Sequence, residues 1–390
     1  MSAGALRPAM KSARPTWAWR DALSTPSASA ATIHPVRDFR LRTDLKRAVI
    51  NGFALPLGID PGADLSRFKA PFQGYTVTYT PAQDDEPDTY AFHVVVSHEK
   101  LAPIIHKVFE LLPEEVYGII EIGSRDAYRS TDVYIGQEAV PADHFVSVWK
   151  TYEQFLLEDG SLAAGANSED PFIEIFLDQW KGLSMHVPAD MQERVEAMLH
   201  GFGVEEVPQT WPAAESDDEL GEGTLVRPVL ELVDEYSPDV DELLLTLRHE
   251  WSLELNIDPE SNVDDGGRSL GTTLWHAVVI VEEATPNGQA TAEKRPTRPH
   301  GKNDPPRGAY ASIWATAKSL SEMERLIEEA LDEHPQWAFG EIYTVDRVAF
   351  DERPDQLADL RPGRREPQVH LVTFEPWDEP PPKRDDMMSG

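Results

Sequence analysis

The hydrophobic and polar positions along the chain predict the same succession of elements twice. Alternating or continuous apolar runs predict strands, and apolar residues spaced three or four apart predict helices. The first stretch has the order strand, strand, helix, strand at residues 75–80, 90–97, 101–112 and 117–122. The second stretch repeats that order at residues 273–281, 310–317, 323–331 and 339–345. We therefore expect an α+β protein with two related halves, each a mostly antiparallel sheet with helices packed on one face and a ββαβ-type core.

Short matching sequence segments in the two stretches support an internal duplication of this unit. The word LGIDP at 57–61 matches LNIDP at 255–259, and FIEIFLDQW at 172–180 parallels VHLVTFEPW at 369–377. Agreement of order, spacing and identity at separate places indicates a repeated unit. An additional amphipathic helix, predicted at 145–156, would then be an insertion in the first half.

Charge and proline content divide the chain further. The expected segments are a basic, disordered N-terminal arm, a first α+β domain, an acidic flexible linker, a second α+β domain and a disordered tail, at residues 1–43, 44–211, 212–224, 225–377 and 378–390. The arm carries seven basic and two acidic side chains, which suits it to an acidic partner or to the body of the protein itself.

The chain as a whole is strongly acidic, with a formal net charge of -34, and it contains no cysteine. A surface this negative repels phosphate backbones and anionic lipids, so we expect no direct nucleic-acid binding by the body of the protein and no membrane association. The lack of cysteine excludes disulfides, thiolate metal ligands and cysteine nucleophiles. No apolar run approaches the roughly 20 residues that span a bilayer, and no signal-peptide core is recognisable. The expected location is the cytoplasm.

Motifs that bind phosphate, dinucleotides or metals are absent or incomplete. Residues 266–273, GGRSLGTT, have the glycine spacing of a phosphate loop, but a threonine stands where its lysine belongs and a strand follows. Oxygen ligands alternate over 258–264 as in a calcium loop, without the glycine that such a loop needs. Three histidines lie on or beside apolar faces, at His93, His106 and His276. We therefore expect no metal and no cofactor.

The densest polar constellation follows a predicted strand at residues 123–134. Its members are Arg125, Asp126, Tyr128, Arg129 and Asp132. Two arginines can hold a carboxylate or phosphate through paired hydrogen bonds, and a tyrosine can stack on a ligand. Alternatively, these side chains form a local ion-pair network that fixes a corner between strands.

Asp178 is a further candidate ligand-binding residue, because it lies at the end of an apolar strand. Burial there would raise its pKa and suit it to acid or base catalysis, although no second carboxylate is identifiable as its partner. The alternative is a strand-end cap beside a packed Trp180.

The loop at 285–308 is basic although the chain is acidic. Its basic residues are Lys294, Arg295, Arg298, Lys302 and Arg307. Opposite charge makes the loop a candidate contact for an acidic protein partner or for a second copy of the chain. A solvated surface insertion is the alternative.

Two functions from different classes remain. The first is a non-catalytic binding or regulatory protein that engages a protein partner through paired α+β domains. The second is an enzyme of unknown reaction with its site at the junction of the two halves. We favour the first, because the residue types for chemistry are present but no catalytic spacing is. Mimicry of nucleic acid by the acidic linker region is a third hypothesis.

Overall fold

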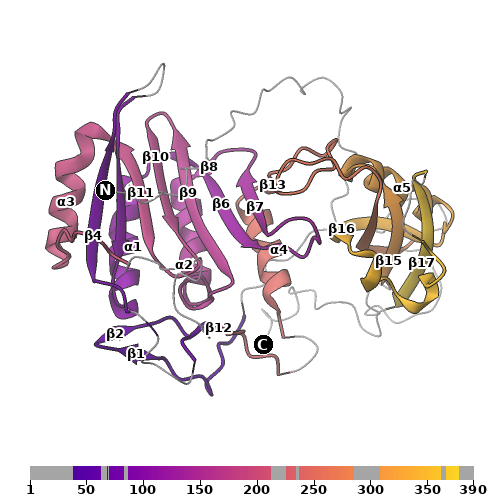
Figure 1. Ribbon diagram of the computed structural model, residues 1–390, viewed down its shortest axis with the longest axis horizontal. Helices are drawn as coiled ribbons and strands as arrows, with labels where there is room; N and C mark the ends of the chain where they lie inside the picture. The colour runs from indigo at the N-terminus through magenta and orange to yellow at the C-terminus, as the bar shows by residue number, and fades with distance from the viewer. Residues whose placement is uncertain are drawn as a thin grey trace, which may run out of the picture.

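The computed structural model describes residues 38–62, 68, 70–82, 87–211, 225–233, 237–284, 308–361 and 366–376. Within these residues, five α-helices and several antiparallel sheets form two layered bodies, one at each end of the molecule (Figure 1). The protein is therefore α+β, as the hydrophobic pattern predicts. None of the described helices is both long and apolar enough to cross a bilayer.

The larger sheet has the strand order β13-β7-β6-β9-β10-β11-β5-β4, all antiparallel, and β8 pairs with β6. Its strands are β4 (Gly74–Thr80), β5 (Thr89–Val95), β6 (Glu115–Gly123), β7 (Thr131–Gly136), β8 (Val140–Pro141), β9 (Leu162–Glu169), β10 (Phe172–Leu177), β11 (Leu183–Pro188) and β13 (Leu253–Leu255). Buried and half-buried residues alternate along β10 and β11. One face of this sheet is therefore packed, while the other is partly open.

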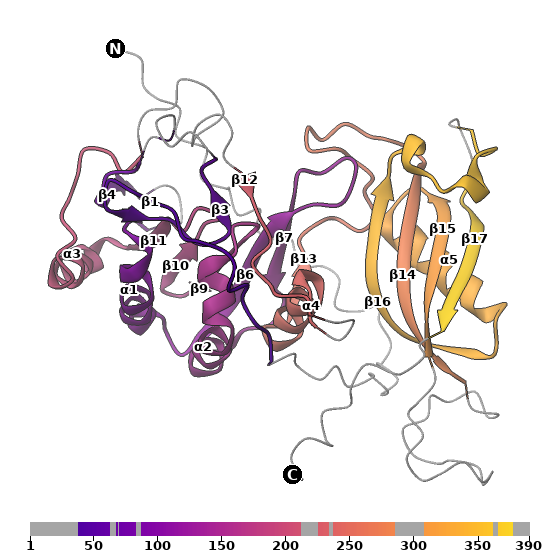
Figure 2. The ribbon, with the colours of Figure 1, turned by 90° about the horizontal axis from the view of Figure 1, so that it is seen from below.

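Helices cover the packed face of the larger sheet. They are α1 (Leu101–Val108), α2 (Ala142–Glu158) and α4 (Val240–Glu250), which lie side by side (Figure 2), with α3 (Gln192–Gly201) near β4. Their apolar faces meet in an aromatic cluster, where the Trp149 ring lies 4.9 Å from Phe109 and the Trp251 ring 4.7 Å from Phe145. Helix α2 confirms the helix predicted at 145–156. The large buried area of these rings makes the cluster the centre of the core.

Two short ribbons lie beside the larger sheet: β1 (Val49–Ile50) pairs with β2 (Phe53–Ala54), and β3 (Ile59–Asp60) pairs with β12 (Leu225–Val226). Glu158, at the end of α2, ties this region to the core because it accepts hydrogen bonds from Arg47 and from the Leu57 backbone. Burial alone would raise the pKa of Glu158, but hydrogen bonds from His98 and Arg47 lower it to about 2.

The smaller sheet has the strand order β16-β14-β15-β17. It consists of β14 (Thr273–Glu283), β15 (Gly308–Ala317), β16 (Trp337–Val348) and β17 (Gln368–Pro376), and α5 (Leu320–Asp332) covers one face. The Ser319 side chain caps α5 by accepting a hydrogen bond from the Glu322 backbone. Every second residue of β15 on the α5 face is small or aliphatic, which lets the helix pack closely. The opposite face is polar and aromatic.

The strand order does not confirm the duplicated ββαβ unit. Each stretch does run strand, strand, helix, strand along the chain. The strand that follows the helix, however, has different neighbours: β6 pairs with β7 and β9, whereas β16 pairs with β14. The matching words also differ in place, since Ile59 lies in the small β3 ribbon and Leu255 ends β13 of the larger sheet. The hydrophobic period and short matching sequence segments indicate the type of an element and its buried face. They carry little information about which strand a given strand pairs with.

The chain after the expected linker returns to the larger body. Residues 212–224 lie outside the described residues, as do the tail at 378–390 and residues 1–37 of the N-terminal arm. Beyond the linker position, α4 contributes Leu243 and Leu247 to the first core, and β13 forms an edge of the larger sheet. The smaller body is built from β14 onward. Residues 38–43 of the arm are also part of the larger body, because Leu41 forms a bridge with Leu230.

Candidate functional site

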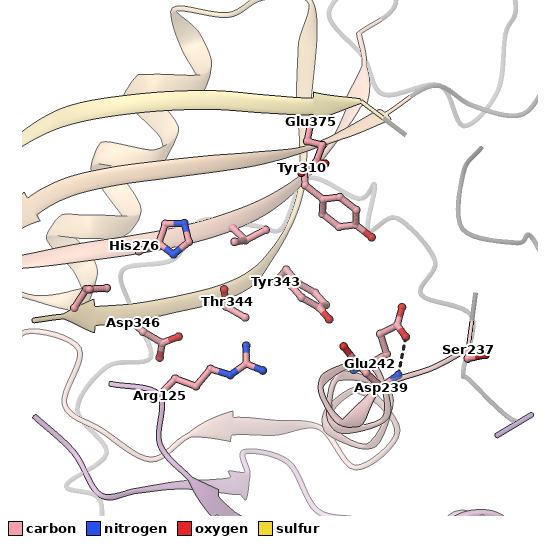
Figure 3. Close-up of a pocket in the computed structure, with 12 residues that line it drawn as sticks. Arg125, Ser237, Asp239, Glu242, His276, Tyr310, Tyr343, Thr344, Asp346 and Glu375 are labelled. Carbon is pink, nitrogen blue, oxygen red and sulfur yellow. Dashed lines mark hydrogen bonds between the residues drawn. The ribbon is translucent and has the colours of Figure 1, made fainter. Parts of the chain in front are cut away.

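A cleft of about 580 Å³ separates the smaller sheet from the larger body. Its first wall is the sheet face opposite α5, to which β14, β15, β16 and β17 all contribute side chains. Its second wall comes from the larger body, where Arg125 follows β6 and Asp239 and Glu242 lie at the start of α4 (Figure 3). The cleft therefore exists only because the two bodies are joined side by side, a common setting for binding sites.

An irregularity in β16 aims a tyrosine into this cleft. The β14–β16 register shifts between Val278 and Val279, so that Thr344 and Ile342 pair with consecutive residues and Tyr343 is the extra one. Ile342 packs toward α5, whereas Tyr343 and Thr344 both line the cleft. A β-bulge reverses the side-chain alternation of a strand in this way.

The start of α4 supplies negative charge to the second wall. Asp239 and Glu242 form a capping box, in which the Asp239 carboxylate accepts from the Glu242 backbone and the Glu242 carboxylate accepts from the Asp239 backbone. The helix N-terminus is therefore already supplied with carboxylates, so it offers no site for an anionic ligand. Arg125 crosses to the same helix and pairs with Asp241.

The electrostatics of the cleft follow from an excess of carboxylates. Asp239, Glu242, Asp346 and Glu375 line it, and the one guanidinium among the lining residues is that of Arg125. Burial, together with the negative charges of Asp132 and Asp126, raises the pKa of Asp346 to about 6. Burial and then the carboxylates at the start of α4 raise the pKa of Tyr343 above its ordinary value. A cation entering the cleft would relieve this repulsion.

His276 completes the sheet wall and lies opposite Asp346 in the β14–β16 register. Its ring stacks on Trp314 with centroids 4.2 Å apart, and its Nε2 atom lies 2.8 Å from the Ser312 hydroxyl. Burial lowers the pKa of His276, which favours the neutral ring near neutral pH. The residue therefore offers an aromatic surface to the cleft without adding positive charge.

Of the six residues that the sequence indicated as ligand-binding, Arg125 lines the cleft. Asp126, Arg129 and Asp132 pair with one another instead: Arg129 donates to Asp132 at 2.7 Å and lies 3.5 Å from Asp126. This arrangement corresponds to the ion-pair alternative considered for residues 123–134.

Asp126 also holds the two bodies together through Arg347, a residue of β16. The Arg347 side chain donates to Asp126 at 2.7 Å and to the Asn262 side chain and the Val263 carbonyl at 2.8 and 2.7 Å. Arg347 is 3% exposed and Asp126 is 4% exposed, and the guanidinium lies 5.4 Å from the Tyr128 ring. We call this group the Arg347 junction. It joins the loop after β6 to the smaller sheet, so Asp126 and Tyr128 have a structural partner in it.

Asp178 lies far from the cleft, in the larger body. Its carboxylate accepts hydrogen bonds at 2.8 Å from the backbones of Trp180 and Gly182, which is the strand-end cap considered as an alternative. The neighbouring Lys181 is 3% exposed with a φ of 65°, and it donates to the Leu162 carbonyl. Burial lowers the pKa of Lys181 to about 8. This cluster is polar and buried.

The predicted partner-binding residues of the 285–308 loop fall outside the described residues. Sequence reasoning missed most of the cleft, including Tyr310, Tyr343, Asp346 and Glu375. One signal was present: Ile342 and Val345 are three apart, which breaks the alternation expected of a strand. The spacing of Asp239 and Glu242 likewise marks a helix start. No family model, curated protein or solved structure matches the chain.

Proposed function

We propose that the protein is a non-catalytic binding protein that holds a basic side chain of a protein partner in the cleft. The observation that carries this proposal is the excess of carboxylates over the single arginine in a cleft that two tyrosines also line. Among the described residues, Arg129 and Arg125 attract Asp346, but their effect is smaller than that of burial and of the carboxylates of Asp132 and Asp126. A lysine or arginine side chain would supply the missing positive charge and form charge-assisted hydrogen bonds.

The raised pKa of Asp346 supports this assignment because it marks a carboxylate held at a cost to stability. Proteins retain such groups at sites that act on a ligand more often than elsewhere. An anionic partner fits the cleft less well, since the start of α4 is already capped and the lining is negative.

Binding of a basic peptide tests the proposal directly. A fluorescein-labelled peptide with two arginines, ARGGAGGRA, is titrated with the full-length protein in about 0.15 M salt, and binding is followed by fluorescence anisotropy. We expect Asp346→Asn and Glu375→Gln each to weaken binding, and the double variant to weaken it by about tenfold or more.

Asp332→Asn is the matched control, because it removes one negative charge from the exposed end of α5 on the other side of the sheet. It should leave the affinity within about twofold of the original protein. Equal weakening by Asp332→Asn would show that the peptide responds to net charge alone, and the proposal would then be wrong.

An enzyme is the second candidate, and it has one observation in its favour. A carboxyl with a pKa of about 6 in a cleft, opposite a histidine in the strand register, is suited to acid and base catalysis near neutral pH. Hydrolysis of chromogenic esters or amides that rises with a pH midpoint near this pKa, and is lost in Asp346→Asn, would favour the enzyme over the binding protein.

A further inference from the structure

We infer that the partner segment bound in the cleft is a proline-containing basic segment in the polyproline II conformation. This inference rests on the proposed function, because it specifies the shape of the basic segment that the cleft takes. It is carried by the tyrosine pair of the sheet wall and by the positions of the carboxylates around that pair.

The two tyrosines form a slot on the sheet face. Tyr310 projects from β15 and Tyr343 from the bulge of β16, with ring centroids 6.2 Å apart and ring planes inclined at 57°. Each tyrosine is half-buried, and part of it faces the cleft. Tilted aromatic rings on a rigid surface are the feature that recognises proline, because the pyrrolidine ring packs flat against them.

Carboxylates flank this slot at opposite ends. Glu375 pairs with Tyr310 across β15 and β17, and Asp346 lies beyond Tyr343 on β16, so that the tyrosines stand between the two carboxylates in Figure 3. The positions of Glu375 and Asp346 differ by four residues along the strands and by three strand spacings across the sheet. The backbones of these two residues are therefore roughly 20 Å apart. A polyproline II helix rises about 3.1 Å per residue, so basic residues about six positions apart reach both.

Other ways of binding a peptide fit this cleft less well. An amphipathic helix needs a long apolar groove, whereas the aliphatic lining residues are Val278 and Val348. Addition of a strand needs an open sheet edge, which in the smaller sheet is β16 or β17, and one end of β16 is engaged because the Ala127 backbone donates to the Arg347 carbonyl. The cleft also lies on the face of the sheet rather than along its edge.

Three labelled peptides of equal length test the inference by anisotropy with the full-length protein. ARPPAPPRA carries both arginines and the prolines, ARGGAGGRA carries the arginines on a flexible backbone, and AQPPAPPQA carries the prolines alone. We expect ARPPAPPRA to bind about tenfold or more tightly than either of the others, because its backbone is already ordered and both carboxylates are engaged.

The outcomes separate this inference from the proposed function. Equal affinity of the two arginine peptides overturns the inference and leaves the proposed function standing. Failure of both arginine peptides to bind overturns both. Tight binding of AQPPAPPQA would show that the cleft binds proline without any basic residue. That result would contradict both the proposed function and the inference.

A pair of variants ties the result to the tyrosine slot. Tyr343→Leu removes one ring, so it should reduce the affinity for ARPPAPPRA about tenfold and that for ARGGAGGRA by much less. Tyr79→Leu is the control, because it removes a half-exposed tyrosine from β4 at the far edge of the larger sheet. Thermal unfolding of each variant shows that it is folded, and equal loss in both variants would overturn the inference.

Discussion

Arg347 makes a buried contact between the two bodies. Its guanidinium is satisfied on three sides by Asp126, Asn262 and a backbone carbonyl, in a place that water scarcely reaches. A buried charge of this kind depends on its partner, since loss of the partner leaves an uncompensated charge in a medium that solvates it poorly.

We expect Arg347→Met to lower the free energy of unfolding by about 3 to 5 kcal/mol, because it removes the guanidinium paired with the buried Asp126 carboxylate at 2.7 Å and leaves Arg129, at 3.5 Å, as its remaining charged partner. Urea unfolding followed by circular dichroism measures the change. Arg125→Gln is the control, since the Arg125 side chain is 59% exposed and loss of its pair with Asp241 should cost less than about 1 kcal/mol. Similar costs for the two variants would contradict the role given to burial.

Removal of the charge of Asp346 should instead raise the free energy of unfolding, because this charge is unfavourable in the folded protein. Its pKa of about 6 lies above the ordinary 3.8, so the folded state takes up a proton more readily and loses stability as the pH rises between these values. Asp346→Asn should therefore be more stable than the original protein at pH near 7.5, by about 1 to 3 kcal/mol, and equally stable near pH 4. Urea unfolding of both proteins at the two pH values checks this, and a pH-independent difference would contradict it.

At the scale of elements, the strands and helices that the hydrophobic pattern predicts are present in the structure, whereas strands such as β7, β9 and β11 were not predicted. The helix expected at 145–156 is α2, and the strand expected at 117–122 lies within β6. In both elements the buried face follows directly from the local period, so neighbouring residues suffice to define it. The bulge at Tyr343 was not predicted, because the shift depends on how β16 pairs with β14.

Strands β9 and β10 approach each other closely at Gly165, so a larger residue there should destabilise the sheet. A Cβ atom at Gly165 would overlap the Ile175 carbonyl oxygen of the neighbouring strand, and backbone atoms cannot move aside as a flexible side chain would. Gly165→Ala should therefore lower the melting temperature by several degrees, about 5 °C or more. Gly123→Ala is the control, since no atom lies within 4 Å of the added methyl group. Equal melting temperatures for the two variants would show that the strands can separate without cost.

At the scale of the whole molecule, the two bodies meet through the Arg347 junction and across the cleft. The chain order of the elements did not reveal this arrangement, and the sheets observed do not confirm the predicted duplication. Residues 240–255 belong to the larger body although they follow the predicted linker, because Trp251 completes an aromatic cluster with α2.

Coupled unfolding of the two bodies is the expected consequence of the junction. We expect one calorimetric transition for the original protein and two resolved transitions for Arg347→Met, because the bodies then lose the buried guanidinium bonds to Asp126, Asn262 and the Val263 carbonyl. A single transition in both proteins would show that other contacts couple the bodies. Arg125→Gln should again behave like the original protein.

The sequence by itself determined the α+β class, the acidic surface and the faces of individual elements, because these depend on composition and on residues a few positions apart. Only the tertiary structure decided the strand order, the placement of α4 in the larger body and the existence of the cleft. These features arise from contacts between distant residues, such as Arg347 with Asp126, which are 221 positions apart. Local periodicity cannot encode such a pairing, because many arrangements of the same elements bury the same faces.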